Sequence, residues 1–376
     1  MLCGIVIRRR LVKTTRLSVT LYDLEPTLAR VVDVPADSTL PELHDLLQAA
    51  IGWTNSHLHQ FVTADAVYGV ALDDAWPDDQ RDENSAHLAD LGTRFEYVYD
   101  LGDCWTHDVE VVGPGGDAPG CADGYGNCPP EDCGGPGGYA ELLAALADPG
   151  HPDHAEMRSW VGNRLRPFDL AAADQRVRRV AGEVPESVRL LFDLIGDGVK
   201  LTPGGRLPRT IVRGMQQHRP DWYPLDRPAS IEDDLWPLLA LHDVLRRVGL
   251  VRLRHGVLST TRAAGDDLAI VRRLRSAFAP NTFGTEIAEL AVAVLAAEGS
   301  PSLAQLTQRV HELLGHRWQP DGRPLTREDL RTAIVQESAI LRALDLVDKS
   351  DRHAWMAGRS ARSLLPRATM LAELFA

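Results

Sequence analysis

Long apolar runs, lysine and cysteine are all scarce in this sequence. No uninterrupted apolar stretch reaches the roughly 18 residues that a membrane-spanning helix needs, so no membrane partner is expected. The N-terminal segment MLCGIVIRRR places its arginines after a short apolar run, which is the reverse of the charge order in a secretory signal. Both features predict a cytoplasmic protein.

The cysteine and lysine counts each limit one interpretation. Five cysteines in 376 residues is an odd number, which in such a chain favours reduced thiols or metal ligation over a disulfide framework. Lysine supplies only three of the 40 basic residues, and the rest are arginine. Because this bias is typical of a GC-rich coding sequence, a cluster of arginines indicates a binding surface less strongly than usual.

Negative charge is concentrated in the first half of the chain. The formal net charge is -13, but residues 1–180 contain 14 basic and 29 acidic residues, whereas residues 181–376 contain 26 and 24. Local fields decide which partners a surface attracts. The acidic first half either recognises a basic protein or peptide or is a solvated acidic surface, and contact with duplex DNA is expected through the second half.

Alternation of apolar and polar residues dominates the first part of the sequence. Residues 16–34 predict a hairpin of two strands, and the stripe over 40–51 predicts a helix that ends at Gly52. Further strands are expected in short alternating stretches at residues 57–63, 68–72, 95–99 and 105–111. An acidic surface loop is expected over 73–83. The pattern predicts an α+β domain over residues 1–180, a small mixed sheet with packed helices.

The segment CADGYGNCPPEDCGGPGGY, residues 121–139, has the most unusual composition. It is predicted to be one long loop, and such a loop in a compact domain is either functional or disordered. Pro129 and Pro130 stiffen the backbone, and the glycines of residues 134–138 let the chain double back before a helix begins at Tyr139. We expect this loop to stabilise the first domain or to hold a partner.

Three motifs in one order resemble the plasmid pRiA ORF-3-like family. They are TLPELHDLLQAAIGWTNSHLHQF, FEYVYDLGDCWTHDVEV and CPPEDCGGPGGY, and the resemblance covers about residues 15–170. Members of that family are often labelled transposon resolvases. The resemblance implies an α+β fold and a mobile-element setting, and it supplies no catalytic residue. This chain departs from the family by having Thr27-Leu28-Ala29-Arg30 where a Trp-Arg-Arg run is usual.

Three cysteines of the 121–139 segment are candidate zinc ligands. Thiolates of Cys121, Cys128 and Cys133, with His107 from a neighbouring strand, would form a closed Cys3His site. The spacings between these cysteines are wider than in ordinary zinc modules. The alternative is that the thiols pack as small apolar groups, as buried free cysteines do. Other candidates for the fourth ligand are His151, His154 and Cys104.

A second candidate cluster combines His57, Asp103, His107 and Glu131 near the same segment. Alternate residues of a strand point to one face, so these side chains are expected to lie together. They would suit a metal-dependent enzyme. Alternatively, Glu131 and Asp132 would bind a basic peptide. Because the sequence contains no nucleophile motif, a non-enzymatic role is favoured.

The second half predicts mainly helices with two short hairpins. In residues 181–280, a helix over 234–249, a hairpin turning at His255-Gly256 and a helix over 264–278 predict a winged-helix-like unit. Phosphate contacts are expected from arginines of this helix and hairpin, namely Arg246, Arg247, Arg252 and Arg254.

A second winged-helix-like unit is expected in residues 281–376. Helices are predicted over 287–297, 302–314 and 326–341, and a hairpin that turns at Ser350-Asp351 follows them. Together these features predict a non-enzymatic DNA-associated or regulatory protein of mobile-element origin.

Overall fold

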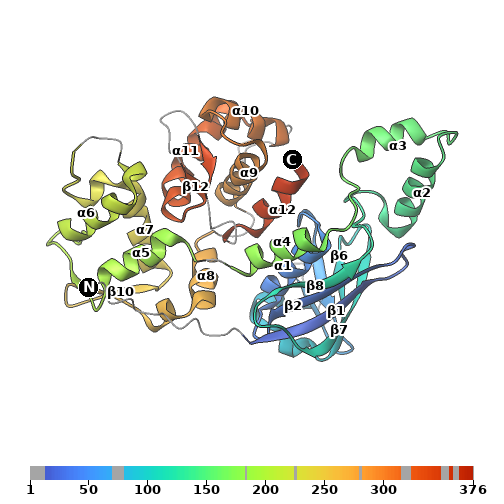
Figure 1. The fold of residues 1–376 in the computed structure, drawn as a ribbon, viewed down its shortest axis with the longest axis horizontal. Coiled ribbons are helices and arrows are strands. Elements are labelled where there is room, and N and C mark those ends of the chain that lie inside the picture. Colours follow the sequence, from blue (N-terminus) through green and yellow to red (C-terminus); the bar gives the residue numbers. More distant parts are fainter. Residues whose placement is uncertain are drawn as a thin grey trace. The chain divides into compact units, whose positions relative to one another are not determined.

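The computed structural model describes residues 13–69, 80–182, 184–223, 227–278, 282–314, 323–348, 355–358 and 364–375. The chain divides into two compact units after Ala181. The first unit is built on a mixed sheet with packed helices, and the second is mostly helical (Figure 1). This order confirms the predicted α+β part followed by a mainly α part.

Among the described residues, an eight-stranded sheet forms the body of the first unit, in the order β5-β4-β3-β6-β7-β1-β2-β8. Its strands are β1 (Thr14–Leu21), β2 (Leu28–Pro35), β3 (His59–Val62), β4 (Val67–Gly69), β5 (Gln80–Asp82), β6 (Arg94–Tyr99), β7 (Trp105–Pro114) and β8 (Gly120–Tyr125). Neighbouring strands pair antiparallel except β4 and β5, which are parallel. The predicted hairpin is confirmed as β1 and β2, with Leu17 opposite Val32.

Helix α1 (Leu40–Ile51) lies across this sheet. It begins where the sequence predicts, because the Thr39 hydroxyl accepts from the Glu42 amide while the Glu42 carboxylate accepts from the Thr39 amide. It ends at Gly52, whose φ of 116° favours glycine. Its apolar stripe is fully buried, and each buried leucine stabilises the fold by about 1.5–3 kcal/mol.

Arg30 of β2 fastens the end of α1 to the sheet. Its guanidinium donates to the carbonyls of Ala50, Tyr125 and Gly126, and it stacks on Phe168 with 3.9 Å between Cζ and the ring centroid. Burial lowers the pKa of Arg30 to about 10, so the group stays charged at neutral pH. A cation at the C-terminus of a helix is stabilising, and Arg30 therefore supports the fold.

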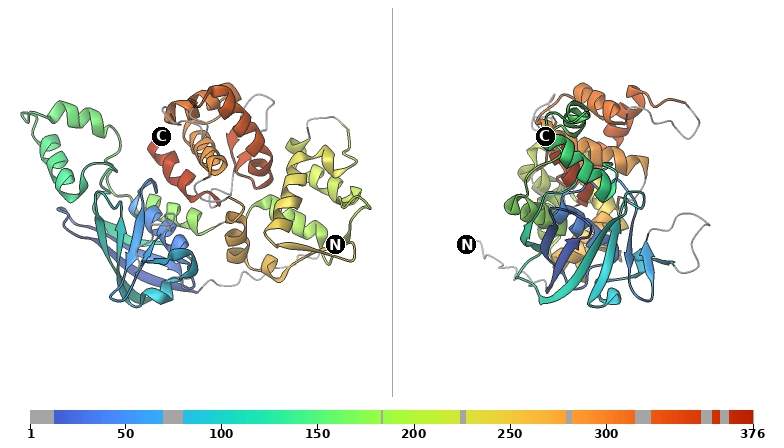
Figure 2. Two further views of the ribbon diagram at one scale, coloured as in Figure 1. Left: turned by 180° about the vertical axis from the view of Figure 1, so that it is seen from behind. Right: turned by 90° about the vertical axis from the view of Figure 1, so that its right-hand side faces the viewer.

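The remaining helices of the first unit are α2 (Gly135–Ala147), α3 (His154–Val161) and α4 (Leu170–Ala181). Helix α4 packs against α1 and β8, and the Arg176 guanidinium donates to the Ala49 carbonyl over 2.7 Å. Helices α2 and α3 pack against each other and project beyond the sheet (Figure 2).

The expected single loop over residues 121–139 is wrong. Strand β8 includes Cys121, and α2 begins at Gly135, so the irregular stretch is only residues 126–134. Gly134 and Gly135 have φ values of 88° and 69°, and they turn the chain directly into the helix. Because both glycines adopt the left-handed backbone conformation, the chain turns at this point and α2 begins at Gly135.

The expected acidic loop over residues 73–83 is also wrong at its end. Residues 80–82 form edge strand β5, and Glu83 begins a short 3-10 helix, Glu83–Ser85, with its side chain buried. His59 Nε2 lies 2.8 Å from the Glu83 carboxylate. Residues 73–79 lie outside the described residues.

The second unit contains helices α5 (Glu186–Ile195), α6 (Arg209–His218), α7 (Trp236–Arg247), α8 (Asp267–Arg275), α9 (Phe283–Glu298), α10 (Leu303–Leu314), α11 (Arg327–Ala343) and α12 (Pro366–Phe375). Strands β9 (Val199–Lys200), β10 (Val251–Arg254) and β11 (Val257–Thr260) form an antiparallel sheet in the order β10-β11-β9. Strands β12 (Val347–Asp348) and β13 (Met356–Ala357) form a second small sheet.

The predicted helices and first hairpin of this unit are confirmed. Helix α7 lies within residues 234–249, and the turn between β10 and β11 uses His255 and Gly256, with φ values of 49° and 78°. The predicted turn at Ser350-Asp351 lies outside the described residues. No single described helix is long and apolar enough to cross a membrane, and α9 with α10 pass that test only as a pair bent by 114°.

Candidate functional site

Three loops of the first unit meet at the end of the sheet where β6 finishes. We call them the loop cluster: residues 52–58, 100–104 and 126–134. The Trp53 indole donates to the Pro129 carbonyl over 2.9 Å, and the Asp100 amide donates to the Leu58 carbonyl over 2.8 Å. The Asp103 carboxylate accepts from the Gly134 amide over 3.1 Å. Each pair of loops is therefore joined directly.

Glu131 is the central anchor of the loop cluster. Its Oε1 accepts from the Thr54 amide over 3.1 Å and from the Tyr99 hydroxyl over 2.5 Å, and its Oε2 accepts from the Thr54 hydroxyl. The Tyr99 hydroxyl in turn accepts from the Ser56 amide over 2.9 Å. Burial and the nearby Glu131 charge raise the pKa of Tyr99, so this hydroxyl remains a donor. Glu131 therefore holds the 126–134 loop in place.

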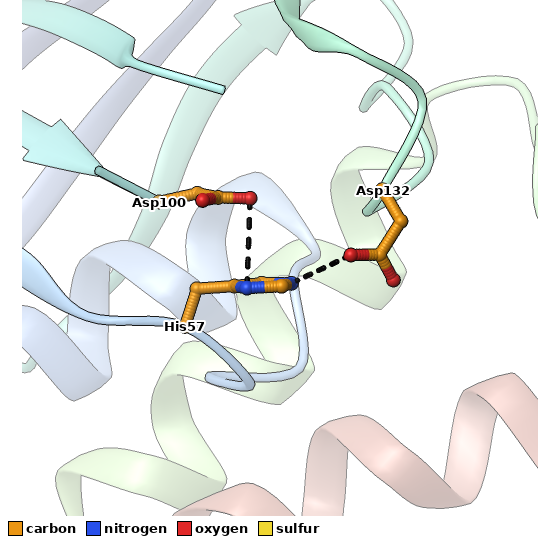
Figure 3. Close-up of side chains that lie close together, drawn as sticks. All are labelled: His57, Asp100 and Asp132. Atoms are coloured by element: carbon orange, nitrogen blue, oxygen red, sulfur yellow. Dashed lines mark ion pairs between the residues drawn. The ribbon is translucent and has the colours of Figure 1, made fainter. Parts of the chain in front are cut away.

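His57, Asp100 and Asp132 gather at the surface of the loop cluster (Figure 3). The distance from His57 Nδ1 to Asp100 Oδ2 is 3.6 Å, and that from His57 Nε2 to Asp132 Oδ1 is 3.2 Å. The His57 side chain is 26% exposed, that of Asp100 12% and that of Asp132 72%. Each of the three residues offers one ligand atom, and these three atoms lie within 4.8 Å of one another.

Left-handed backbone is concentrated in the loop cluster. Seven described non-glycine residues have positive φ, and four of them belong to it: Asn55, Asp100, Cys104 and Asp132, with φ between 54° and 61°. Such a conformation costs roughly 1–2 kcal/mol per residue and persists only where the surroundings impose it. The loop cluster is therefore held in a defined shape.

A buried histidine pair lies deeper in the first unit, between α1 and the sheet. The His44 and His59 rings stack with 3.4 Å between centroids, and His44 Nδ1 lies 2.8 Å from the Tyr97 hydroxyl. Burial lowers the pKa of His59 to about 3 and that of His44 well below its usual value. Burial raises the pKa of Glu83 to about 7. Both histidines are thus neutral at neutral pH.

His44 and Glu83 were not predicted as site residues from the sequence. The signal available for His44 was a histidine within the apolar stripe of a predicted helix, between Leu43 and Leu47. Glu83 gave no local signal, because it contacts His59, which is distant in the sequence.

His107 belongs to the core. It is fully buried on β7, its Nδ1 lies 2.9 Å from the Tyr97 carbonyl oxygen, and its ring meets the Trp53 ring edge-on. Burial lowers its pKa to about 4. The predicted cluster of His57, Asp103, His107 and Glu131 is therefore not assembled. Only His57 of these four belongs to the group in Figure 3.

The predicted Cys3His ligand set is not assembled either. Cys121 is buried on β8, Cys128 and Cys133 are half-buried, and the ligand atoms of these three with His107 do not form a group within 4.8 Å among the described residues. Burial raises the pKa of Cys121 to about 11 and those of Cys128 and Cys133 to about 12, so all three thiols are protonated at neutral pH. Cys121 lies on edge strand β8, whereas Cys128 and Cys133 lie in the 126–134 loop that follows it.

The predicted DNA-contacting arginines lie on two successive elements of the second unit. Arg246 and Arg247 occupy the last turn of α7, and Arg252 and Arg254 lie on β10. All four are exposed.

Comparison with known proteins identifies the first unit. Residues 13–177 match the family described as plasmid pRiA4b ORF-3-like protein. The uncharacterized protein y4hQ of Sinorhizobium fredii is 43% identical over 168 residues, which cover 42% of this chain and 85% of that protein. The crystal structure of MM3350, a protein of unknown function from Methanosarcina mazei Go1, is 29% identical and covers 42% of this chain and 96% of that chain, with a TM-score of 0.38. The resemblance seen in the sequence is thus confirmed, and the chain belongs to the plasmid pRiA4b ORF-3-like family.

Proposed function

We propose that the chain is a non-enzymatic DNA-associated protein of mobile-element origin, and that its second unit carries two winged-helix-like modules. The first module would comprise α5, β9, α6, α7, β10 and β11. Three helices followed by a hairpin, with β9 completing a sheet in the order β10-β11-β9, support this proposal. In that arrangement α7 would be the helix presented to the DNA groove and the β10–β11 hairpin would be the wing.

The order of elements in the remainder of the unit supports a second module. Helices α9, α10 and α11 are followed by β12 and β13 in the same succession. The Trp355 amide donates to the Pro301 carbonyl over 3.2 Å, and this pairing supports a position for residues 299–301 like that of β9 in the first module. Recurrence of one succession of elements is the usual sign of a repeated module.

Unpaired arginines are the observation that carries the DNA-binding proposal. Several arginines of the second unit have carboxylate partners within 3 Å, namely Arg189 with Asp267, Arg206 with Asp233 and Arg309 with Glu298, whereas the exposed Arg213 and Arg262 have none among the described residues. Arg246, Arg247, Arg252 and Arg254 form no ion pair with any residue that the structure describes. Their charges are therefore available to phosphates, which position a protein on DNA without reading its sequence.

The test is binding of the full chain to a 30-base-pair duplex, measured by fluorescence anisotropy at low salt. Replacing Arg252 and Arg254 by alanine should weaken binding by on the order of tenfold or more, because two phosphate contacts are lost. A control removes the same charge from the first unit by replacing Arg158 and Arg166, and it should bind like the wild type. Equal loss in both variants, or no binding by the wild type, would contradict the proposal.

A second candidate role is recognition of a basic peptide by the first unit. A pocket of about 540 Å³ between α2 and α3 is lined by four carboxylates together with Met157 and Trp160. The carboxylates are those of Asp132, Glu141, Asp153 and Glu156. An acidic pocket suits a lysine or arginine side chain, and Trp160 already stacks on one guanidinium, that of Arg164, with 4.0 Å between Cζ and the ring centroid. Titration with a poly-arginine peptide should show binding that Glu141→Gln with Glu156→Gln abolishes, and unchanged affinity would rule this pocket out.

A further inference from the structure

We propose that His57, Asp100 and Asp132 bind one divalent first-row transition-metal ion in the loop cluster. The 3.2 Å separation of His57 Nε2 from Asp132 Oδ1 matches two atoms that share an ion, because ligands about 2.1 Å from one metal lie roughly 3.0–3.4 Å apart. Asp100 brings a third ligand atom within 4.8 Å of the other two. The two carboxylates lie beside different nitrogens of the imidazole, Asp100 beside Nδ1 and Asp132 beside Nε2 (Figure 3), and the ion would bind on the Nε2 side.

The donor set indicates which class of metal would bind. One imidazole with two carboxylates carries a charge of -2 when the histidine is neutral, which balances a divalent ion. Imidazole suits zinc and iron, whereas carboxylates also suit manganese, so a mixed set favours Mn²⁺, Fe²⁺ or Zn²⁺ over Ca²⁺, which takes oxygen ligands. Three protein ligands leave at least one coordination position for water or a substrate.

The electrostatic surroundings favour a cation at this position. Between Arg94 and Arg158 the sequence contains no lysine or arginine and 13 aspartates and glutamates. Among the described ion pairs, those of Asp100 and Asp132 both involve His57, and neither carboxylate pairs with an arginine or lysine. Two carboxylates held beside one imidazole are left with excess negative charge, which a divalent ion would neutralise.

Tyr99 and its neighbours hold all three ligand residues in place. Asp100 follows Tyr99 directly, the His57 amide donates to the Tyr99 hydroxyl over 3.3 Å, and Asp132 follows Glu131, to which that hydroxyl donates. The Asp100 Oδ1 atom accepts from the Gly102 amide over 3.0 Å, which leaves Oδ2 facing the imidazole. Partners behind the ligands that fix their orientation are typical of metal sites.

The site is also accessible. Asp132 is 72% exposed and lines the 540 Å³ pocket between α2 and α3, so an ion or a small molecule can reach the ligands from that side. The alternative for this geometry is a protonated His57 between two carboxylates without a metal. Metal titration distinguishes the metal site from this ion pair, because only the metal site would bind one ion per chain.

The experiment titrates the EDTA-treated, dialysed full chain with Mn²⁺ and follows free Mn²⁺ by electron paramagnetic resonance. Manganese is the probe because it prefers oxygen and imidazole ligands to thiolates. We expect one Mn²⁺ per chain, with affinity at least tenfold weaker in both His57→Ala and Asp132→Asn. Asp132→Asn should fold normally because its side chain is mostly exposed.

The matched control is Asp153→Asn, which removes one carboxylate from the same pocket outside the proposed site. It should bind Mn²⁺ like the wild type. The proposal is overturned if the wild type binds no Mn²⁺ at millimolar concentration, if His57→Ala binds unchanged, or if Asp153→Asn weakens binding as much as Asp132→Asn does. The last result would indicate a diffuse acidic surface. The outcome does not depend on DNA binding by the second unit.

Discussion

Removal of the Glu131 carboxylate should loosen the loop cluster and lower the stability of the first unit. In Glu131→Ala, the Thr54 amide and the Tyr99 hydroxyl both lose their acceptor, and both residues are buried. A buried donor without a partner costs about 1–3 kcal/mol, so the expected loss is about 2–6 kcal/mol. Glu131→Gln retains an acceptor at this position and should cost about 1–2 kcal/mol.

The assay is hydrogen exchange measured by mass spectrometry on peptides from β3 and β6, which reports the first unit separately from the second. The matched control is Asp132→Asn, which changes the neighbouring exposed carboxylate and should shift stability by less than about 0.5 kcal/mol. Unchanged protection in Glu131→Ala, or an equal loss in Asp132→Asn, would refute the anchoring role of Glu131.

Three further predictions concern the core, the second unit and the thiols. The native His107 imidazole stays neutral down to its pKa of about 4, whereas the unfolded chain protonates it below about 6.5. The stability that His107 contributes above pH 6.5 should therefore fall by about 2 kcal/mol at pH 5, and the lowered pKa values of His44 and His59 should add to this loss. Denaturant titrations at pH 5 and 8 should show this loss of stability. The loss should be smaller in His107→Phe and unchanged in His87→Phe, a control at an exposed position. Trp236 is 73% exposed at the start of α7 and should contact DNA without an ionic component. Trp236→Ala should therefore weaken duplex binding while the salt dependence of binding stays the same. The control Phe283→Ala, at the start of α9, should not weaken binding. Elemental analysis should find the same metal content after Cys121, Cys128 and Cys133 are replaced by alanine, and a loss would assign the metal to the thiols.

Local features of the sequence predicted much of the fold. Helix α1 carries its start signal in Thr39 and Glu42 and its stop signal in Gly52, and the β1–β2 hairpin follows from alternation within one short stretch. The order of the eight strands could not be predicted in this way, because it depends on pairings between distant residues. Strand β9 was missed because two residues carry no periodicity.

The candidate site was predicted only in part for the same reason. Its region was recognised from the unusual composition of residues 121–139, and His57 and Asp132 were named. Asp100 was not predicted, although its position directly after an alternating strand was a usable signal. His107 was misplaced because strand parity alone does not say which face of a sheet is covered, and α1 covers the face of His107.

The salt dependence of duplex binding tests the central claim, that unpaired arginines of the second unit contact DNA, most directly. The logarithm of the binding constant falls with the logarithm of salt concentration by about 0.9 per phosphate contact. Four contacts predict a slope of about -3.6 for the wild type and about -1.8 after Arg252 and Arg254 are replaced by alanine. The same slope in both proteins would contradict the claim.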